Sequence, residues 1–290
     1  MFLPKKVLEE KLRRFLEEDL GQGDVTTAIT IPKDLIVEAT VVAKEPGTIA
    51  GLEETLVFLE SFGLKAEAKV VDGVEVKPHV VLLWVTGDAR TLLSLERTLL
   101  NLLSRMSGIA TMTRRVVRKV REAGYATRVA CTRKVAPGLA YFDKKAVMVG
   151  GGDVHRLHLD DMVLIKDNHI TIVGDAEGAV RKAREHVSFS KKIEVEVSSL
   201  EDAIKVAEDK ADIIMLDNFT PDQIIKTLKA LERKNLRGKV MVEASGGISE
   251  KNILEFAATG VDIVSLSELT QSTRALNISL EVVKVEKQKK

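Results

Sequence analysis

The second half of the chain alternates between short apolar runs and amphipathic stretches, and no other feature of the sequence constrains the fold as strongly. The apolar, β-branched runs lie at residues 126–131, 162–165, 193–197, 212–216, 240–243 and 261–266. Stretches with helical periodicity separate most of them, at residues 176–187, 200–207, 222–231 and 250–258. Strands that alternate with helices form parallel sheets through right-handed crossovers. The pattern therefore predicts an α/β fold with a barrel or partial barrel of parallel strands, and a doubly wound open sheet is the alternative.

The first third of the chain has a different pattern and predicts a separate, smaller α+β unit. A helix is expected after Pro4, with Gly21 just beyond its end. Short β-branched runs follow at residues 36–42, 69–71 and 80–85, with one helical stretch at residues 52–62. Leucines at helical spacing over residues 92–106 then predict a long helix that leads into the second domain.

The charge balance excludes two classes of protein. The chain has 290 residues, with 44 Lys and Arg against 43 Asp and Glu, so its formal net charge is +1. General nucleic-acid binders and polybasic membrane-surface proteins need an excess of positive charge. The apolar runs are far shorter than the ~20 residues that span a bilayer, and the N-terminus lacks the apolar core of a signal peptide. A single cysteine, Cys131, excludes an intramolecular disulfide, so we expect a cytoplasmic protein that binds neither nucleic acid nor membranes.

Polar residues stand at the carboxyl ends of the predicted strands. They are Thr132-Arg133-Lys134, Lys166 to His169, Glu196, Asp217-Asn218, Glu243 to Gly247 and Ser265 to Ser267. A single charged residue at such a position is more often a solvated side chain than part of an active site. Because barrel enzymes carry their active sites at this edge, polar groups on consecutive strands indicate one shared active site.

The basic residues of this region predict an anionic ligand. The candidates are Arg133, Lys134, His155, Arg156 and Lys166. Between residues 128 and 166, seven Lys and Arg stand against four Asp. Arginine forks bind the oxygens of carboxylates and phosphates two at a time. This set therefore suits a ligand with several negative charges.

The acidic residues that follow predict a second binding role in the same site. Between residues 194 and 217, eight acidic residues stand against two lysines. Within this stretch Glu196 and Asp217 end two strands, and carboxylates beside a phosphate-bearing ligand commonly bind ribose hydroxyls or hydrated Mg²⁺. Ser245-Gly246-Gly247 leads from a strand toward a predicted helix, where backbone N–H groups can meet phosphate oxygens. A sugar phosphate or pyrophosphate with magnesium would satisfy both sets.

Two further features favour structural roles. His155-x-x-His158 has the spacing of a metal-binding pair, but no third ligand type stands nearby, so a metal site there is disfavoured. Cys131 lies next to Arg133, yet no histidine is arranged to activate it, so we expect a small core residue.

A set of ordered motifs resembles one known family. In the second half they are Thr132-Arg133-Lys134-x-x-Pro137-Gly138, Gly150-Gly-Gly-x-x-His155-Arg156, Leu164-Ile165-Lys166-Asp167-Asn168-His169, Glu194-Val-Glu196-Val, Leu216-Asp217-Asn218-Phe219 and Glu243-Ala-Ser245-Gly-Gly-Ile. Upstream they are Glu18-Asp19-Leu20-Gly21-x-Gly23-Asp24-x-Thr26-Thr27 and Glu96-Arg97-Thr98-x-x-Asn101-x-x-Ser104-x-x-Ser107-Gly108-Ile109-Ala110. Over residues 9–281 the chain resembles the quinolinate phosphoribosyltransferase family.

The resemblance implies a fold, an assembly and a reaction. The fold would be an N-terminal α/β sandwich, residues 1–108 joined by residues 271–290, and a C-terminal incomplete (open) α/β barrel, residues 109–270. The assembly would be a homodimer, or a higher oligomer, whose active sites are shared between subunits. Quinolinate and phosphoribosyl pyrophosphate would give nicotinate mononucleotide, pyrophosphate and CO₂ with Mg²⁺, in de novo NAD synthesis.

The same resemblance implies a role for each candidate residue. Arg133, His155 and Arg156, with Arg97 of the partner subunit, would hold the two carboxylates of quinolinate. Lys134 and Lys166 would lie between quinolinate and the phosphoribosyl group, and Lys166 would also bind quinolinate. Glu196 and Asp217 would bind ribose hydroxyls and magnesium, and with the two lysines they would be catalytic. Ser245, Gly246, Gly247 and Ser267 would bind the 5-phosphate.

Two positions depart from the family pattern. Ser267 stands where glycine is common, and we expect it to reshape the 5-phosphate contact. Asn277 stands where aspartate is usual, in the C-terminal segment that returns to the first domain, and we expect a structural role.

Three other functions fit part of the pattern. A nicotinate phosphoribosyltransferase would share the phosphoribosyl site, but a monocarboxylate does not need four cationic groups around its ring. A barrel aldolase could use Lys166 as a Schiff base, but the two acidic strand ends would then lack a role. A non-catalytic sensor of phosphorylated metabolites would need the cationic pocket without Glu196 and Asp217.

Overall fold

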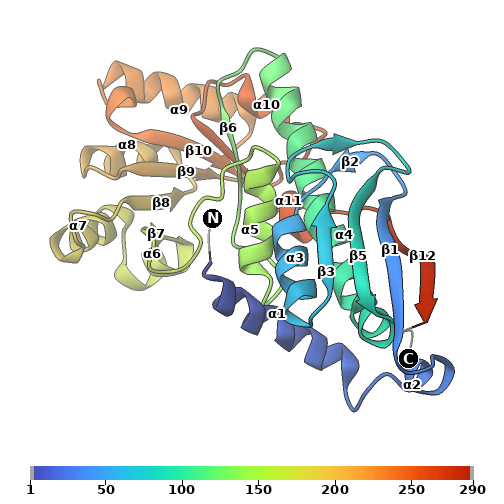
Figure 1. Cartoon of the computed structure of the whole chain (residues 1–290). Helices are drawn as coiled ribbons and strands as arrows, with labels where there is room; N and C mark the ends of the chain where they lie inside the picture. Colours follow the sequence, from blue (N-terminus) through green and yellow to red (C-terminus); the bar gives the residue numbers. More distant parts are fainter. Residues whose placement is uncertain (1–2, 288–290) are drawn as a thin grey trace. The chain divides into compact units, whose positions relative to one another are not determined.

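The computed structural model of the chain describes residues 3–287 (Figure 1). The chain divides into two compact units, one formed by Met1–Met112 with Thr273–Lys290 and the other by Thr113–Ser272. Among the described residues, no helix is both long enough and apolar enough to cross a membrane.

The first unit is built on a four-stranded antiparallel sheet in the order β12-β1-β5-β3. Its strands are β1 (Leu35–Ala43), β3 (Lys65–Ala68), β5 (Val81–Asp88) and β12 (Ile278–Lys287), with a separate pair β2 (Gly47–Thr48) and β4 (Glu75–Val76). Its helices are α1 (Lys5–Leu20), α2 (Val25–Thr30), α3 (Leu52–Ser61) and α4 (Ala89–Glu122), which continues past Met112. Helix α3 packs against β3 and against α1, whose Leu8, Leu12 and Leu16 are buried. This is the α/β sandwich that the resemblance implies.

Several elements of the first unit differ from the expectation: β2, β4 and β12 were not expected, and β3 and α2 differ as follows. The strand expected at residues 69–71 lies earlier, at Lys65–Ala68. Only the N–H of Lys69 still bonds to β5, at 2.8 Å from the Leu82 carbonyl, because the chain then turns at Gly73, whose φ is 90°. Helix α2 was not expected, although Asp24 is its N-cap and accepts a hydrogen bond from the Thr27 N–H at 2.9 Å.

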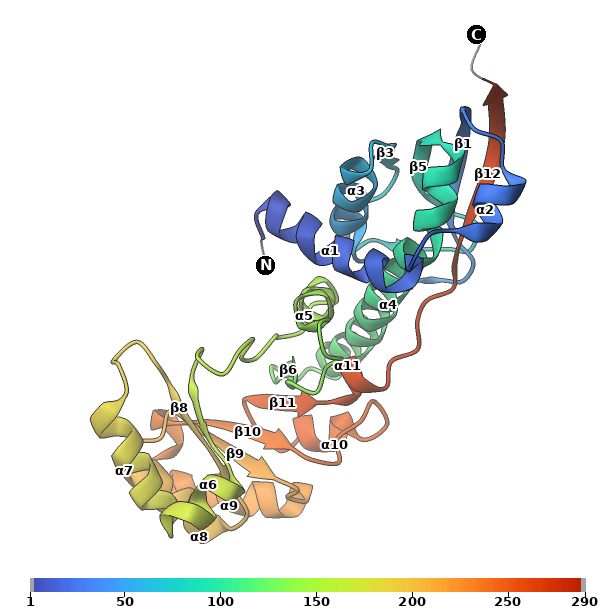
Figure 2. The same ribbon diagram turned by 90° about the horizontal axis from the view of Figure 1, so that it is seen from below.

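The second unit is built on six parallel strands in the order β6-β11-β10-β9-β8-β7. They are β6 (Arg128–Cys131), β7 (Val163–Ile165), β8 (Ile193–Val197), β9 (Ile213–Asp217), β10 (Met241–Ser245) and β11 (Ile263–Leu266). The helices are α5 (Ala140–Val149), α6 (Asp167–Val173), α7 (Ala176–His186), α8 (Leu200–Glu208), α9 (Pro221–Arg233), α10 (Ile253–Ala257) and α11 (Glu268–Gln271), with a 3₁₀ turn at Arg237–Lys239. Helices α7 and α8 contact β8, and α7, α8 and α9 lie on one side of the sheet (Figure 2). The α/β fold with an open barrel is confirmed.

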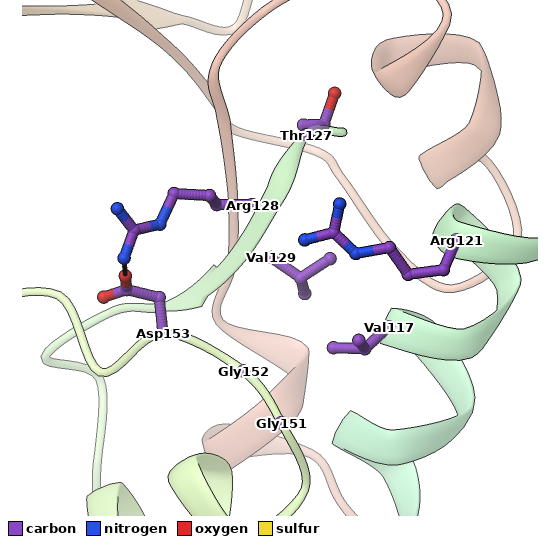
Figure 3. A pocket seen from close by; sticks show the side chains of 8 residues that line it. All are labelled: Val117, Arg121, Thr127, Arg128, Val129, Gly151, Gly152 and Asp153. Atoms are coloured by element: carbon purple, nitrogen blue, oxygen red, sulfur yellow. Dashed lines mark ion pairs between the residues drawn. The ribbon is translucent and has the colours of Figure 1, made fainter. Parts of the chain in front are cut away.

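The strand order shows why the barrel is open. Consecutive strands β6 and β7 are the two edges of the sheet, and residues 132–162 connect them. In this connection Asp153 forms a parallel bridge with Ala130, and its carboxylate pairs with Arg128 at 2.5 Å (Figure 3). The neighbouring turn fits only glycine at residue 152, because a Cβ there would lie 2.7 Å from the side chain of Thr113. The connection therefore packs along the edge of β6 and leaves β7 as the other edge.

Candidate active site

A cavity of about 580 Å³ lies at the carboxyl ends of the parallel strands. The candidate residues that line it are Arg133, Lys134, His155, Arg156, Lys166, Glu196, Asp217, Ser245, Gly246, Gly247 and Ser267. They come from all six strand ends and from the connection between β6 and β7, so the structure brings together every candidate of the second unit. The remaining candidate, Arg97, lies on α4 in the first unit, where its side chain is exposed.

An ion pair joins the cationic and acidic residues of the cavity. Lys166 follows β7, and its Nζ lies 2.7 Å from a carboxylate oxygen of Glu196 on β8. The Glu196 side chain is 14% exposed and that of Lys166 is 44% exposed, so the lysine reaches into the open part of the cavity. Burial raises the pKa of the next carboxyl group, Asp217 on β9, and the charge of Glu196 raises it further. A bound cation would relieve this repulsion.

The ends of β9 and β10 are held together around Gly246. The N–H of Asn218 donates to the Ser245 carbonyl at 2.9 Å, and its side-chain amide donates to Asp217 at 2.6 Å. Gly246 has a φ of 89°, and a Cβ there would lie 2.4 Å from Oδ1 of Asn218. The helix expected at residues 250–258 begins only at Ile253, so its N-terminus lies farther from the Gly246 turn than expected. Hydrogen bonds between Asn252 and both Ser249 and Gly247 order the intervening loop instead.

His155 faces two buried carboxylates. Its Nε2 lies 3.3 Å from Glu194 on β8 and 3.2 Å from Glu243 on β10, and both glutamates are fully buried. Burial lowers the pKa of His155, but the hydrogen bonds with Glu194 and Glu243 outweigh it and raise the pKa to about 10. The sequence shows only that two carboxylates stand inside apolar strands, where burial is costly without a partner. The partner, His155, comes from a distant loop.

We expect His155 to make the stability of the protein depend on pH. A histidine pKa of about 10 in the folded state exceeds the usual 6.5, so its contribution is complete below pH ~6.5 and is lost as the pH rises toward about 10. The free energy of unfolding should fall over this range by up to about 5 kcal/mol more in the wild type than in His155→Gln. Denaturant titrations of both proteins between pH 6 and 10 measure the difference.

A ring titration by NMR provides an independent check of the same prediction. The Arg156 N–H donates to Nδ1 of His155 at 2.8 Å, and that hydrogen bond requires Nδ1 to be unprotonated. If this hydrogen bond outweighs the pairing of Nε2 with Glu194 and Glu243, the imidazole titrates close to its usual pKa. Such a result, together with identical pH profiles for the two proteins, would contradict the prediction.

The structure separates the two histidines of the His155-x-x-His158 motif, and each lies beside carboxylates that were not expected to be its partners. His155 lies with Glu194 and Glu243, whereas His158 lies with Asp160 and Asp161, so the two histidines do not form one pair. Cys131 is fully buried at the end of β6. Burial raises the pKa of its thiol, which disfavours a reactive thiolate.

Comparison with known proteins identifies the family. The quinolinate phosphoribosyl transferase N-terminal domain matches residues 24–107, and the C-terminal domain of the same family matches residues 109–281. A Methanocaldococcus jannaschii protein named probable nicotinate-nucleotide pyrophosphorylase (carboxylating) is 48% identical over 94% of this chain and 96% of its own length. The nicotinate-nucleotide pyrophosphorylase (carboxylating) of Mycobacterium leprae is 41% identical over 94% of this chain and 96% of its own length.

A solved structure supports the same assignment over the whole fold. NadC from Streptococcus pyogenes superposes with a TM-score of 0.89 and 33% sequence identity, and the alignment covers 99% of each chain. The match includes both units, and its identity is high enough to indicate common descent as well as a common fold. The chain therefore belongs to the quinolinate phosphoribosyl transferase family.

Proposed function

We propose that the protein transfers the phosphoribosyl group of phosphoribosyl pyrophosphate to quinolinate and decarboxylates the product to nicotinate mononucleotide, as a step of de novo NAD synthesis. The observation that carries this proposal is the meeting of a cationic set and an acidic pair in one cavity of about 580 Å³. The names of the relatives support the same reaction. Quinolinate brings two carboxylates and phosphoribosyl pyrophosphate brings phosphates and ribose hydroxyls, so both kinds of side chain have a partner.

The cationic residues would bind quinolinate. Arg133 and Arg156 line the cavity and can each hold a carboxylate through two parallel hydrogen bonds. His155 lies beside them in the same cavity. Lys166 and Lys134 would lie nearer the phosphoribosyl group, where their charges offset those of pyrophosphate. Arg97 would complete the site of the other subunit in a homodimer.

The acidic residues would stabilise the charge that develops during transfer. The quinolinate nitrogen forms a bond to the anomeric carbon while the bond from that carbon to pyrophosphate breaks, and pyrophosphate leaves with the electron pair. Positive charge builds up on the ribose, close to the carboxylates of Glu196 and Asp217. The ring nitrogen of the product is cationic, so it accepts the electrons released when CO₂ departs, and a proton then takes the place of the carboxylate.

Glu196 and Asp217 also fit a magnesium ion. Mg²⁺ prefers carboxylate oxygens, water and substrate phosphates as ligands, and these two carboxylates stand at adjacent strand ends. Burial and then the charge of Glu196 raise the pKa of Asp217, so a positive charge beside these carboxylates is favourable. When bound, the ion would offset the negative charge of pyrophosphate.

The buried Cys131 suits the reducing cytoplasm that we infer as the location.

The release of CO₂ tests the proposal. Purified protein given quinolinate labelled at the carboxylate next to the ring nitrogen should release labelled CO₂ only with phosphoribosyl pyrophosphate and a divalent cation. Turnover of nicotinate equal to that of quinolinate would favour a nicotinate phosphoribosyltransferase. Trapping of a substrate on Lys166 by borohydride would favour the aldolase, although Lys166 is already paired with Glu196. Binding of phosphorylated metabolites without turnover would favour the sensor.

We expect Gly246→Ala to weaken the binding of phosphoribosyl pyrophosphate. The new Cβ would lie 2.4 Å from Asn218, and the φ of 89° is strained for alanine, so the loop that would hold the 5-phosphate must move. The KM for phosphoribosyl pyrophosphate should rise by about 10- to 100-fold, because misplacement by about 1 Å has effects of this size. Steady-state kinetics with each substrate varied in turn measure it.

Gly260→Ala is the matched control for this change. Gly260 has the same φ of 89°, a Cβ there would meet nothing within 4 Å, and the residue does not line the cavity. Gly260→Ala should lower the stability of the protein through backbone strain without changing the KM for quinolinate or for phosphoribosyl pyrophosphate. Equal KM values for Gly246→Ala and the wild type would show that this loop does not bind the substrate.

A further inference from the structure

Lys144 is a buried lysine whose amine contacts two carbonyl groups of one loop and the thiol of Cys131. It lies on α5 and is 1% exposed. Its Nζ donates to the carbonyl of Val154 at 2.5 Å and to the carbonyl of Arg156 at 3.1 Å. Burial lowers the pKa of Lys144, because a charged amine is unfavourable inside the protein unless its hydrogen bonds are satisfied. The contacts of Lys144 thus fix one specific loop.

The loop needs this support because its central residue is strained. His155, between the two bonded carbonyls, has a φ of 51°, in the left-handed region that is unfavourable for a non-glycine residue. The two flanking carbonyls converge on the same ammonium group. The N–H of His155 is also held, by the Asp153 carboxylate at 2.8 Å. Lys144 therefore stabilises the one backbone conformation that lets residues 154–156 bend at His155.

This bend directs two side chains into the cavity. His155 reaches Glu194 and Glu243, and Arg156 lines the cavity although it is only 8% exposed. In an extended conformation, residues 155 and 156 would point to opposite sides of the chain, and one of them would leave the cavity. Lys144 does not line the cavity, so it acts on a ligand through the groups that it contacts, which are the two loop carbonyls and the thiol of Cys131.

We propose that Lys144 is a positioning residue for quinolinate, which holds the backbone at residues 154–156 so that His155 is anchored on Glu194 and Glu243 and Arg156 presents its guanidinium to a substrate carboxylate. This inference rests on the proposed function. It concerns the half of the cavity that binds the dicarboxylate, because the loop contacts β8 and β10 through Glu194 and Glu243, whereas Glu196 and Asp217 pair with Lys166 and Asn218.

Lys144→Met tests the proposal, because methionine keeps the length and apolar stem of lysine but cannot donate to either carbonyl. We expect the KM for quinolinate to rise about tenfold or more, as a buried carbonyl without a donor drives the loop to rearrange. The KM for phosphoribosyl pyrophosphate should change by less than about twofold. Calorimetric binding of phthalate, a dicarboxylate of the same shape that cannot react, should weaken in parallel with quinolinate.

A second buried lysine of the same helix provides the matched control. Lys145 is 5% exposed and does not line the cavity, so Lys145→Met should cost stability, seen as a lower Tm, without separating the two KM values. If Lys144→Met is too unstable to purify, Lys144→Gln keeps one donating group and should give a smaller increase in the quinolinate KM.

Two outcomes would overturn the proposal. One is an unchanged affinity of the Lys144 variants for quinolinate and phthalate, and the other is an equal rise of both KM values. Wild-type protein that releases no CO₂ from quinolinate would instead refute the proposed function. The failure of the inference and the failure of the function are therefore separate results.

Discussion

Glu196→Gln is expected to lower kcat about 10²- to 10³-fold, the usual effect of removing one group that stabilises charge in the transition state. Glutamine keeps the size of the side chain but loses the charge that lies 2.7 Å from Lys166 and close to Asp217. Without it, the cationic ribose would be less stabilised and Lys166 would lose its partner. The KM for quinolinate should change little, because the cationic residues that would bind it are untouched. Single-turnover assays of CO₂ release measure the effect on chemistry.

Glu201→Gln is the matched control for the loss of a carboxylate. Glu201 is exposed in the first turn of α8, directly after the strand that carries Glu196. It should leave kcat unchanged, because a surface charge is screened by solvent. A kcat for Glu196→Gln within about threefold of the wild type would refute the catalytic role of this carboxylate.

Arg97→Ala is expected to lower kcat/KM for quinolinate about 10²- to 10³-fold, since a substrate carboxylate would lose its paired guanidinium. Arg97 is exposed on α4 of the first unit. We expect it to serve the site of the partner subunit, so a mixture with Lys166→Ala should regain activity. In a hybrid dimer one site would then keep both intact residues, and random exchange should restore about one quarter of the wild-type activity.

The mixing experiment distinguishes the two possible placements of Arg97. If Arg97 served its own subunit, every site in the mixture would lack either Arg97 or Lys166, and no activity would return. Native mass spectrometry of one isotopically labelled variant shows whether subunits exchange. Exchange without recovered activity would refute the sharing of sites between subunits.

Most of the second unit could be predicted from the sequence because its strands are buried on both faces. Val195, Ile214, Val242 and Val264 are fully buried, and such residues form continuous apolar runs that stand out between helices. The predicted strands accordingly overlap all six observed ones. The first unit was less predictable. Its strand at Lys65–Ala68 contains two charged residues and no β-branched residue, so it lacks the signal that a buried strand provides.

The polar part of the cavity could also be predicted, and for a related reason. Parallel strands bring all their carboxyl ends to one edge, so Lys166, Glu196 and Asp217 must meet whatever the details of packing. The start of the helix expected at residues 250–258 is the exception, because the helix begins only at Ile253. Seven residues, 246–252, separate β10 from α10, and side-chain hydrogen bonds of Asn252 rather than helix periodicity order part of this loop.

The sequence by itself determined the α/β architecture, the edge that carries the site and the separation of cationic from acidic residues behind a net charge of +1. Each of these follows from periodicity and from the order of residues along the strands. The tertiary structure decided that the sheet stays open between its edge strands β6 and β7, which residues 132–162 connect. It also decided that His155 meets Glu194 and Glu243 while Lys144 holds its loop. These contacts join residues far apart in the chain through buried polar groups, and only the folded geometry determines which partners satisfy them.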